Sequence, residues 1–140
     1  MQTRPALIAL TVPRVSDTAK PEMESYSRHA IVCTGRFCSP QGGGRAIYAR
    51  LAQMLDREDL LFGPARVKRS EAPCLGVCAG GPVVAVYPEG VWYHSVDIPM
   101  LDRIVCEHLR DGHPVLDRVF HQLGTTRPNE PLAKGVKTKQ

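Results

Sequence analysis

The spacing of four cysteines constrains this chain more than any other feature. Four residues separate Cys33 from Cys38, and three separate Cys74 from Cys78. The second pair lies in the run Cys-Leu-Gly-Val-Cys-Ala-Gly-Gly-Pro, which ends at Pro82 and is too rich in glycine for the interior of a helix or strand. Four thiolates brought together from two loops can hold a metal centre, and both zinc and iron–sulfur clusters take four thiolates.

The gaps within the pairs favour a cluster over a single zinc ion. A zinc ribbon usually takes its ligands from tight Cys-x2-Cys knuckles, although gaps of up to four residues occur. A two-iron cluster is wider than one ion, because each iron takes its own pair of thiolates, and longer glycine-rich loops wrap it more easily. Backbone N–H groups that can point toward sulfur are those of Gly35, Gly76, Gly80 and Gly81. A structural zinc module stays open as the alternative.

Cys74 and Cys78 allow a third interpretation, a thiol–disulfide reductase that uses them as a dithiol. Such enzymes normally place Cys-x-x-Cys at the N-terminus of a helix that follows the first strand. This pair is one residue wider and occurs late in the chain. The spacing therefore argues against a reductase.

The composition sets limits on compartment and partners. The chain has five cysteines, an odd number, and no secretory signal, so we expect a reducing cytoplasm rather than a disulfide scaffold. The formal net charge of +4 is too small an excess to indicate nucleic acid binding. The apolar run from Ala6 to Leu10 is too short to span a membrane. The fifth cysteine, Cys106, is expected to be a small, partly buried residue.

Hydrophobic periodicity predicts alternating strands and helices. Apolar residues recur with helical spacing between Arg45 and Arg57, and again after Asp97, which can cap a second helix. We expect strands at 29–33, 67–70, 83–87 and 91–94, helices at 45–57 and 97–112, and one more short element within 115–123. The first strand–helix–strand should be a right-handed parallel unit, and residues 83–94 should form a β-hairpin. The predicted fold class is α/β, a mixed sheet flanked by helices, with a C-terminal β-hairpin and helix.

The ordered domain is expected to span residues 29–123. Residues 1–28 contain scattered charge and no sustained period, which indicates a flexible leader, although Leu7 to Val12 could add a strand. Residues 124–140 are polar and rich in lysine near their end, a composition typical of a disordered tail.

Two segments around the cysteines resemble a known family. The first is Val-Cys-Thr-Gly-Arg-Phe-Cys at residues 32–38, and the second runs from Cys74 to Tyr93, with Cys-x3-Cys followed by Gly-Pro and a hydrophobic hairpin. Both resemble the thioredoxin-like [2Fe–2S] ferredoxins and the related small [2Fe–2S] subunit of NADH:quinone oxidoreductases. The resemblance covers residues 29–115.

The resemblance implies that Cys33, Cys38, Cys74 and Cys78 bind one [2Fe–2S] cluster per chain, the first pair on one iron and the second pair on the other. It implies a thioredoxin-like fold with a cis peptide bond before Pro82, and a homodimer. It also implies a one-electron carrier, not an enzyme, that works between a donor reductase and an acceptor oxidoreductase. No catalytic base, nucleophile or substrate cleft is visible in the sequence, and no two histidines have metal-ligand spacing.

Several other residues near the cysteines have roles that the sequence leaves open. Basic side chains that could offset cluster charge or guide a partner are those of Arg36, Arg45, Lys68 and Arg69. Trp92 and Tyr93 are neighbours on the predicted hairpin. One is expected in the core, and the other near the cluster or at a dimer contact.

Overall fold

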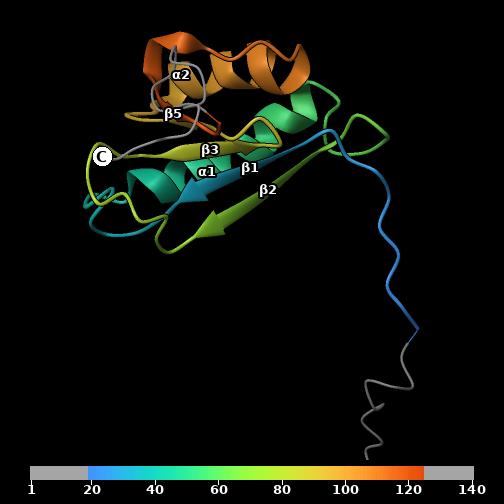
Figure 1. The fold of residues 1–140 in the computed structure, drawn as a ribbon, viewed down its shortest axis with the longest axis horizontal. Coiled ribbons are helices and arrows are strands. Elements are labelled where there is room, and N and C mark those ends of the chain that lie inside the picture. The colour runs from blue at the N-terminus through green and yellow to red at the C-terminus, as the bar shows by residue number, and fades with distance from the viewer. Residues whose placement is uncertain (1–18, 125–140) are drawn as a thin grey trace, which may run out of the picture.

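The computed structural model describes residues 19–124. Residues 1–18 and 125–140, which include the strand considered at 7–12 and nearly all of the expected tail, lie outside the described residues. Five strands form one sheet in the spatial order β2-β1-β3-β4-β5. Figure 1 shows β2, β1 and β3 side by side. Their bounds are Arg28–Cys33 (β1), Val67–Ala72 (β2), Val84–Tyr87 (β3), Val91–Tyr93 (β4) and Val119–Gln122 (β5).

The pairing of β1 with β2 brings the two cysteine loops to one edge of the sheet. These strands are parallel, with Cys33 opposite Ala72. The other pairings are antiparallel, so the sheet is mixed, as predicted. Because parallel strands end at the same edge, the loop after Cys33 and the loop after Ala72 start side by side. Cys74 is two residues beyond Ala72.

The strand boundaries differ from the sequence predictions by one or two residues. β2 extends to Ala72, two residues beyond its predicted end, which carries the ordered ladder closer to Cys74. β3 begins at Val84 and β4 ends at Tyr93, so the hairpin is one residue shorter at each outer end than predicted.

The first helix, α1 (Gly43–Arg57), begins two residues earlier than predicted. Its buried side chains include those that the periodicity selected: Ile47, Leu51, Met54 and Leu55. Gly44 lies in the first turn, and a Cβ at this position would overlap the carbonyl oxygen of Cys33. The absence of a side chain therefore lets the start of α1 pack directly against the end of β1.

The second helix begins at the predicted cap and changes its hydrogen-bonding pattern midway. The N–H of Met100 donates to Asp97 Oδ1 at 2.9 Å, which caps α2 (Ile98–Arg103). The chain continues as a π-helix, η2 (Ile104–Arg110), which was not predicted because hydrophobic spacing does not distinguish α-helical from π-helical turns. A 3₁₀ turn, η3 (Leu116–Arg118), then precedes β5. No helix within residues 19–124 is long and apolar enough to cross a bilayer.

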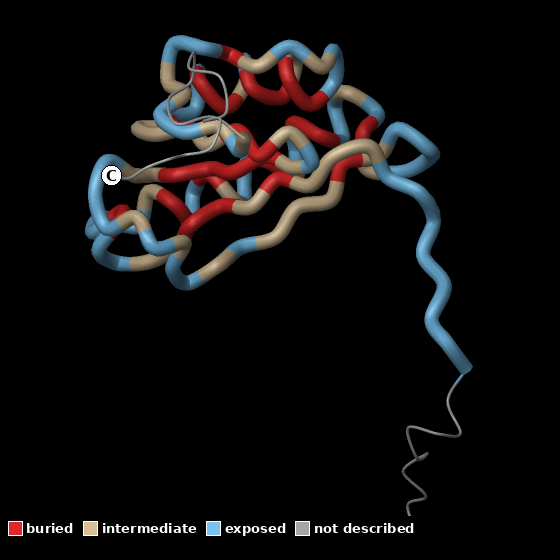
Figure 2. Tube along the Cα trace, in the orientation of Figure 1, coloured by how far each residue is buried: buried red, intermediate tan, exposed pale blue. Residues whose placement is uncertain are grey.

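The helices and one face of the sheet enclose the main core. α1 contacts β1 and β2, and it also contacts α2 and η2. The buried segments of strands and helices meet at the centre of the domain in Figure 2. The core side chains include Ala30, Val32, Leu51, Leu55, Val84, Val86, Val91, Tyr93, Leu101, Ile104 and Leu109.

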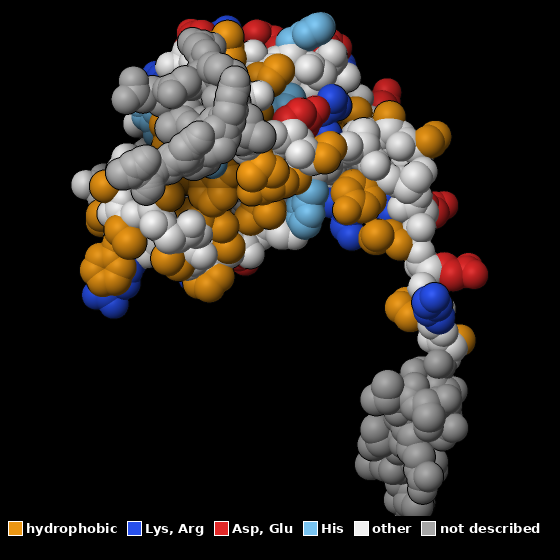
Figure 3. Space-filling view, in the orientation of Figure 1, with side chains coloured by type: hydrophobic (Ala, Val, Ile, Leu, Met, Phe, Trp, Pro, Cys, Tyr) orange, Lys and Arg blue, Asp and Glu red, His pale blue; other side chains and the backbone are white. Residues whose placement is uncertain are grey.

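The other face of the sheet carries an apolar strip. Ile31, Ala85 and Trp92 lie opposite one another across β1, β3 and β4. Ile31 and Trp92 are partly exposed. Figure 3 shows hydrophobic side chains gathered over the strands on this side.

Candidate metal centre

Cys33 and Cys38 form the buried half of the site. Cys33 is the last residue of β1, and Cys38 lies in the loop that leads to α1. Backbone hydrogen bonds hold the start of this loop between neighbouring strands. The N–H of Cys33 donates to the Val83 carbonyl at 3.0 Å, and the N–H of Thr34 donates to the Ala72 carbonyl at 2.9 Å. The end of β1 thereby fixes the position of the first thiol.

Cys74 and Cys78 form the exposed half, in the loop between β2 and β3. The N–H of Gly76 donates to the Cys74 sulfur at 3.2 Å, so the loop directs a backbone donor at this sulfur. Leu75 and Val77 alternate with the exposed residues of the loop and anchor it. They pack against a small buried group made of Cys33, Cys38 and Val83.

One cavity, of about 40 Å³, is lined by both cysteine pairs. Its walls are Cys33, Gly35, Phe37, Cys38, Pro73, Cys74, Val77 and Cys78. Within residues 19–124, no three His, Cys, Asp or Glu side chains are arranged as ligands of one metal ion. The structure therefore brings the four predicted residues to one shared cavity without placing three of them around a single point. A two-iron cluster requires two thiolates at each iron rather than four at one point.

Gly81 forms a close wall beside the buried pair. A Cβ at this position would overlap the sulfur and the carbonyl oxygen of Cys38. Only glycine therefore fits between the loop before β3 and Cys38 without a shift of the backbone. The peptide bond from Gly81 to Pro82 is cis, as the family resemblance implied.

The surroundings of Cys38 oppose its ionisation. Burial raises the pKa of the Cys38 thiol, and a hydrogen bond with the Cys33 thiol raises it further. The Val83 backbone acts in the opposite direction, but the pKa of Cys38 remains above its ordinary value. A bound metal ion reverses this preference because it stabilises the thiolate. Metal binding at this pair therefore releases protons.

Ser39 carries a buried hydroxyl without a partner. The residue is 8% exposed, and its Oγ makes no hydrogen bond to any described residue. Such orphaned groups are rare in folded proteins, because a buried polar atom loses its hydrogen bonds to water. Free thiols, a glycine wall and an orphaned donor next to Cys38 fit a site built around an anionic cluster. No pattern in the sequence predicted that Ser39 would be buried.

Trp92 and Tyr93 take opposite sides of the sheet, as neighbours in a strand must. Tyr93 is fully buried in the core, whereas Trp92 packs against the buried group formed by Cys33, Cys38 and Val83. The Trp92 Nε1–H donates to the Tyr87 hydroxyl at 3.3 Å. The structure thus decides a choice that the sequence left open.

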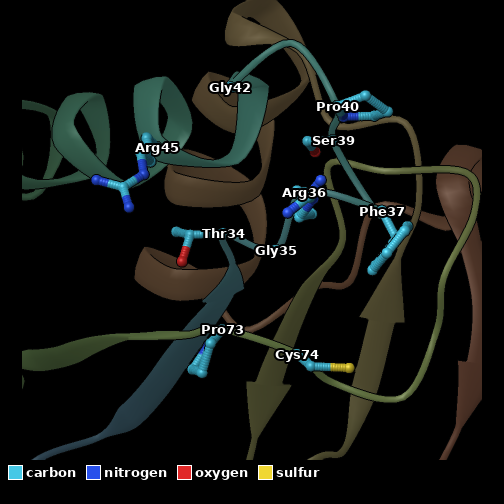
Figure 4. A pocket seen from close by; sticks show the side chains of 10 residues that line it. All are labelled: Thr34, Gly35, Arg36, Phe37, Ser39, Pro40, Gly42, Arg45, Pro73 and Cys74. Carbon is cyan, nitrogen blue, oxygen red and sulfur yellow. The ribbon is translucent and has the colours of Figure 1, made fainter.

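A larger pocket, of about 590 Å³, opens beside the cavity and is shown in Figure 4. Arg36, Phe37, Arg45 and Cys74 are among its lining residues. The Phe37 ring is 72% exposed, and the Arg36 guanidinium lies 5.6 Å from its centroid. Neither arginine forms an ion pair with a residue in 19–124. The pocket therefore combines exposed apolar surface with two uncompensated positive charges.

Lys68 and Arg69 lie along β2 instead of at the pocket. Lys68 Nζ is 5.2 Å from the Tyr26 ring centroid, and the Arg69 guanidinium is 4.3 Å from the Tyr48 ring centroid. Lys68 precedes Ala72 by four residues, roughly 13 Å along an extended strand. Closeness in sequence to the cysteines thus does not bring these two cations to the site.

Cys106 does not line the cavity. It lies on η2, where it is partly exposed, as expected. Its sulfur accepts a 3.5 Å hydrogen bond from Arg57 Nη2.

Comparison with known proteins finds relatives and a similar solved structure that are named as [2Fe–2S] ferredoxins. No family model matches the chain. It is 32% identical over 101 residues to a 2Fe–2S ferredoxin of Clostridium pasteurianum, which covers 66% of this chain and 95% of the relative. It is 36% identical over 95 residues to a 2Fe–2S ferredoxin of Aquifex aeolicus (strain VF5), which covers 63% of this chain and 84% of the relative.

A solved structure agrees with these relatives. The wild-type thioredoxin-like [2Fe–2S] ferredoxin from Aquifex aeolicus superposes with a TM-score of 0.60 at 32% identity, over 69% of this chain and 99% of that chain. Two further similar structures are variants of that ferredoxin in which single cysteines, four positions apart in its chain, are replaced by serine.

The sheet, its helices and the cavity between two cysteine pairs define a small iron–sulfur protein with a thioredoxin-like fold. The chain belongs to the family of thioredoxin-like [2Fe–2S] ferredoxins. Its cofactor is a [2Fe–2S] cluster, and it is an iron–sulfur electron carrier. The zinc and dithiol alternatives are not favoured by any of these relatives.

Proposed function

We propose that Cys33, Cys38, Cys74 and Cys78 are the four ligands of the cluster. The observation that carries this proposal is the single cavity that both pairs line, although they come from separate loops. Following the family resemblance, the first pair serves one iron and the second pair serves the other. The serine-substituted cysteines of the Aquifex ferredoxin are four positions apart in its chain, as are Cys74 and Cys78 in this one, and this spacing supports the second pair.

The two halves of the site have different tasks. Cys33 and Cys38 are buried under Val83 and Trp92, so they hold the cluster away from water on the inner side. Cys74 and Cys78 are exposed, so they define the side from which a partner reaches the cluster. The bound cluster supplies a one-electron couple whose overall charge changes from about −2 to about −3 on reduction.

Redox partners therefore dock over the loop of Cys74. The protein takes an electron from a reductase and passes it to an acceptor oxidoreductase, and it performs no catalysis of its own. Arg36 and Arg45, unpaired at the neighbouring pocket, favour a partner with an acidic surface at this point. The exposed Phe37 ring adds apolar contact area beside them.

Residues 29–123 form the electron-transfer domain, between the leader at 1–28 and the tail at 124–140.

The protein works as a homodimer in the cytoplasm. The partly exposed Ile31 and Trp92 on the helix-free face of the sheet are compatible with a covered surface. Paired reduced cysteines suit the cytoplasm. Analytical ultracentrifugation of the loaded protein tests the dimer, which a monomer-sized species at micromolar concentration would contradict.

Alanine substitution of one cysteine at a time tests the ligand set. Alanine is used because the hydroxyl of serine can still bind iron. We expect each of Cys33→Ala, Cys38→Ala, Cys74→Ala and Cys78→Ala to lose most of its iron and sulfide, measured per chain after anaerobic purification. The matched control is Cys106→Ala, which also removes one thiol and should keep the full content. Full iron and sulfide in any of the first four variants would remove that residue from the set.

A further inference from the structure

Ser39 carries a polar group that the fold alone leaves without a function. Its backbone is satisfied, because its N–H donates to the Gly35 carbonyl at 3.0 Å and its carbonyl accepts from the Gly42 N–H at 3.0 Å. Only the hydroxyl remains without a partner, and it is shielded from water. Burying an unpaired hydroxyl destabilises a fold, so an acceptor that arrives with the cofactor is expected.

Cys38 directly precedes Ser39, is itself buried, and lines the cavity that both cysteine pairs share. A cluster bound there would make the Cys38 sulfur a thiolate, and a charged sulfur accepts hydrogen bonds more strongly than a neutral thiol does. The Cys38 sulfur is therefore the acceptor that the cofactor brings to the Ser39 hydroxyl.

We propose that the Ser39 hydroxyl donates a hydrogen bond to the Cys38 sulfur of the bound cluster and raises the reduction potential of the cluster. The inference rests on the proposed ligand set, in which Cys38 is a cluster thiolate. Reduction adds one negative charge that is shared with the cysteine sulfurs, so a donor at sulfur stabilises the reduced form more than the oxidised form. Ser39 is thus a positioning and tuning residue that acts through Cys38.

Thr34 provides a matched comparison at the other buried ligand. It also directly follows a cysteine, Cys33, and it also carries a hydroxyl near the site. Its Oγ1, however, donates to the Ala72 carbonyl at 3.4 Å and so already has an acceptor. Removal of the Thr34 hydroxyl should therefore leave the potential of the cluster unchanged.

The test is a dye-mediated, anaerobic potentiometric titration of the loaded protein. We expect Ser39→Ala to lower the equilibrium constant for reduction about tenfold, which is about 59 mV for a one-electron couple. Thr34→Val should have the same midpoint potential as the wild-type protein. Equal midpoint potentials for Ser39→Ala and the wild type would overturn the inference.

A second, shape-matched pair keeps the test decisive if Ser39→Ala loads poorly. Ser39→Thr retains a hydroxyl, and Ser39→Val replaces it with a methyl group of similar size. The midpoint potential of Ser39→Thr should be close to that of the wild type, and the midpoint potential of Ser39→Val should be lower. Identical potentials for the two variants would contradict the role of the hydroxyl. Visible absorbance is read first in every sample. If the wild-type protein itself holds no cluster, the result counts against the proposed ligand set. If all variants hold a cluster and share one midpoint potential, the result counts against the role of Ser39 alone.

Discussion

The cysteine edge of the sheet and the helix-covered region around His108 satisfy their buried polar groups in different ways. At the cysteine edge, the Ser39 hydroxyl has no partner and the buried Cys38 thiol is held above its ordinary pKa by burial. Around His108, buried polar atoms serve one another. The Tyr93 hydroxyl and His108 Nδ1 are 2.7 Å apart, and the Val115 N–H donates to the same hydroxyl at 3.0 Å.

The network around His108 continues to the start of β1. His108 Nε2 faces Glu89 Oε1 at 3.5 Å, and neither atom forms a hydrogen bond to a described residue. Arg28 Nε donates to the other oxygen of Glu89 at 2.8 Å. The buried polar groups of this region therefore face one another within the chain, whereas the cysteine edge is completed by a cofactor. Substitutions at the first should change stability, and substitutions at the second should change cofactor content and potential.

The largest effect is expected for Gly81→Ala. The added methyl group would overlap the Cys38 sulfur, so the variant should lose most of its iron and be destabilised by about 1–3 kcal/mol through overpacking. Gly43→Ala is the control, because its Cβ would meet the Pro82 ring at 3.1 Å and the Ser39 Cβ at 3.8 Å but would not overlap a cysteine. Iron analysis measures the loss of the cluster, and thermal unfolding measures the loss of stability. Wild-type iron content in Gly81→Ala would show that this wall does not shape the cluster site.

At the helix-covered region, Tyr93→Phe should lower stability without changing the cluster. It leaves the Val115 N–H and His108 Nδ1 without partners, which should cost about 2–3 kcal/mol. The control is Tyr48→Phe, which removes a hydroxyl at a partly buried position on α1 and should cost less than about 0.5 kcal/mol. Anaerobic urea unfolding gives the difference, and visible spectra should be identical. A loss of iron in Tyr93→Phe would break the separation between the two regions.

Acid should weaken the same region. Burial lowers the pKa of His108, and the Arg28 charge lowers it further, against the opposite influence of Glu89. The unfolded chain then binds a proton near the ordinary pKa of 6.5 that the folded chain does not bind, so the free energy of unfolding falls as the pH drops below about 6.5. Each unit by which the pKa is lowered is worth about 1.4 kcal/mol.

Stability measured from about pH 8 to about pH 5.5 checks this prediction. His29, whose pKa is also lowered by burial and by Lys68, contributes a decline of the same sign. His108→Phe should therefore reduce the decline without abolishing it. An unchanged pH profile in His108→Phe would mean that His108 titrates alike in both states.

The smallest effect is expected at the pocket beside the cysteines. Arg45→Glu should slow electron transfer from the reduced protein to an acidic haem acceptor, with cytochrome b5 as the probe, by about threefold to tenfold at low salt. The control is Arg50→Glu, with the same charge change on the same helix, about 8 Å farther along its axis. Stopped-flow kinetics compare the two. Equal slowing would indicate that net charge, not the pocket, guides the encounter.

The sequence predicted which cysteines come together at one cavity better than it predicted what surrounds them. The gaps in the cysteine pairs and the hydrophobic periods were enough to predict two cysteine loops on a mixed sheet, because both are patterns local to the chain. The burial of Ser39 and the contact of Trp92 with the cysteine group were not predictable, because both depend on how the loop before α1 folds back onto β3 and β4. Lys68 and Arg69 were also misjudged from the sequence, because an extended strand places residues only a few positions apart at a large distance from each other.

The burial of His108 illustrates a further limit. A histidine among aliphatic residues on a helix gives no sign of its partners, and here they come from β4, the β3–β4 turn and β1. Whether the His108 side chain is exposed or buried therefore depends on tertiary contacts, which no local sequence pattern contains. The helix boundary at Gly43 was missed for a related reason, since Gly44 is required by the end of β1 and not by the helix itself.

The central claim is that the two cysteine pairs hold one redox-active [2Fe–2S] cluster. The visible spectrum of anaerobically purified protein, recorded before and after dithionite, tests it most directly. We predict a red-brown protein whose visible bands bleach on reduction and return on reoxidation in air. A colourless protein that contains stoichiometric zinc and gains no visible bands after reconstitution with iron and sulfide would contradict the claim.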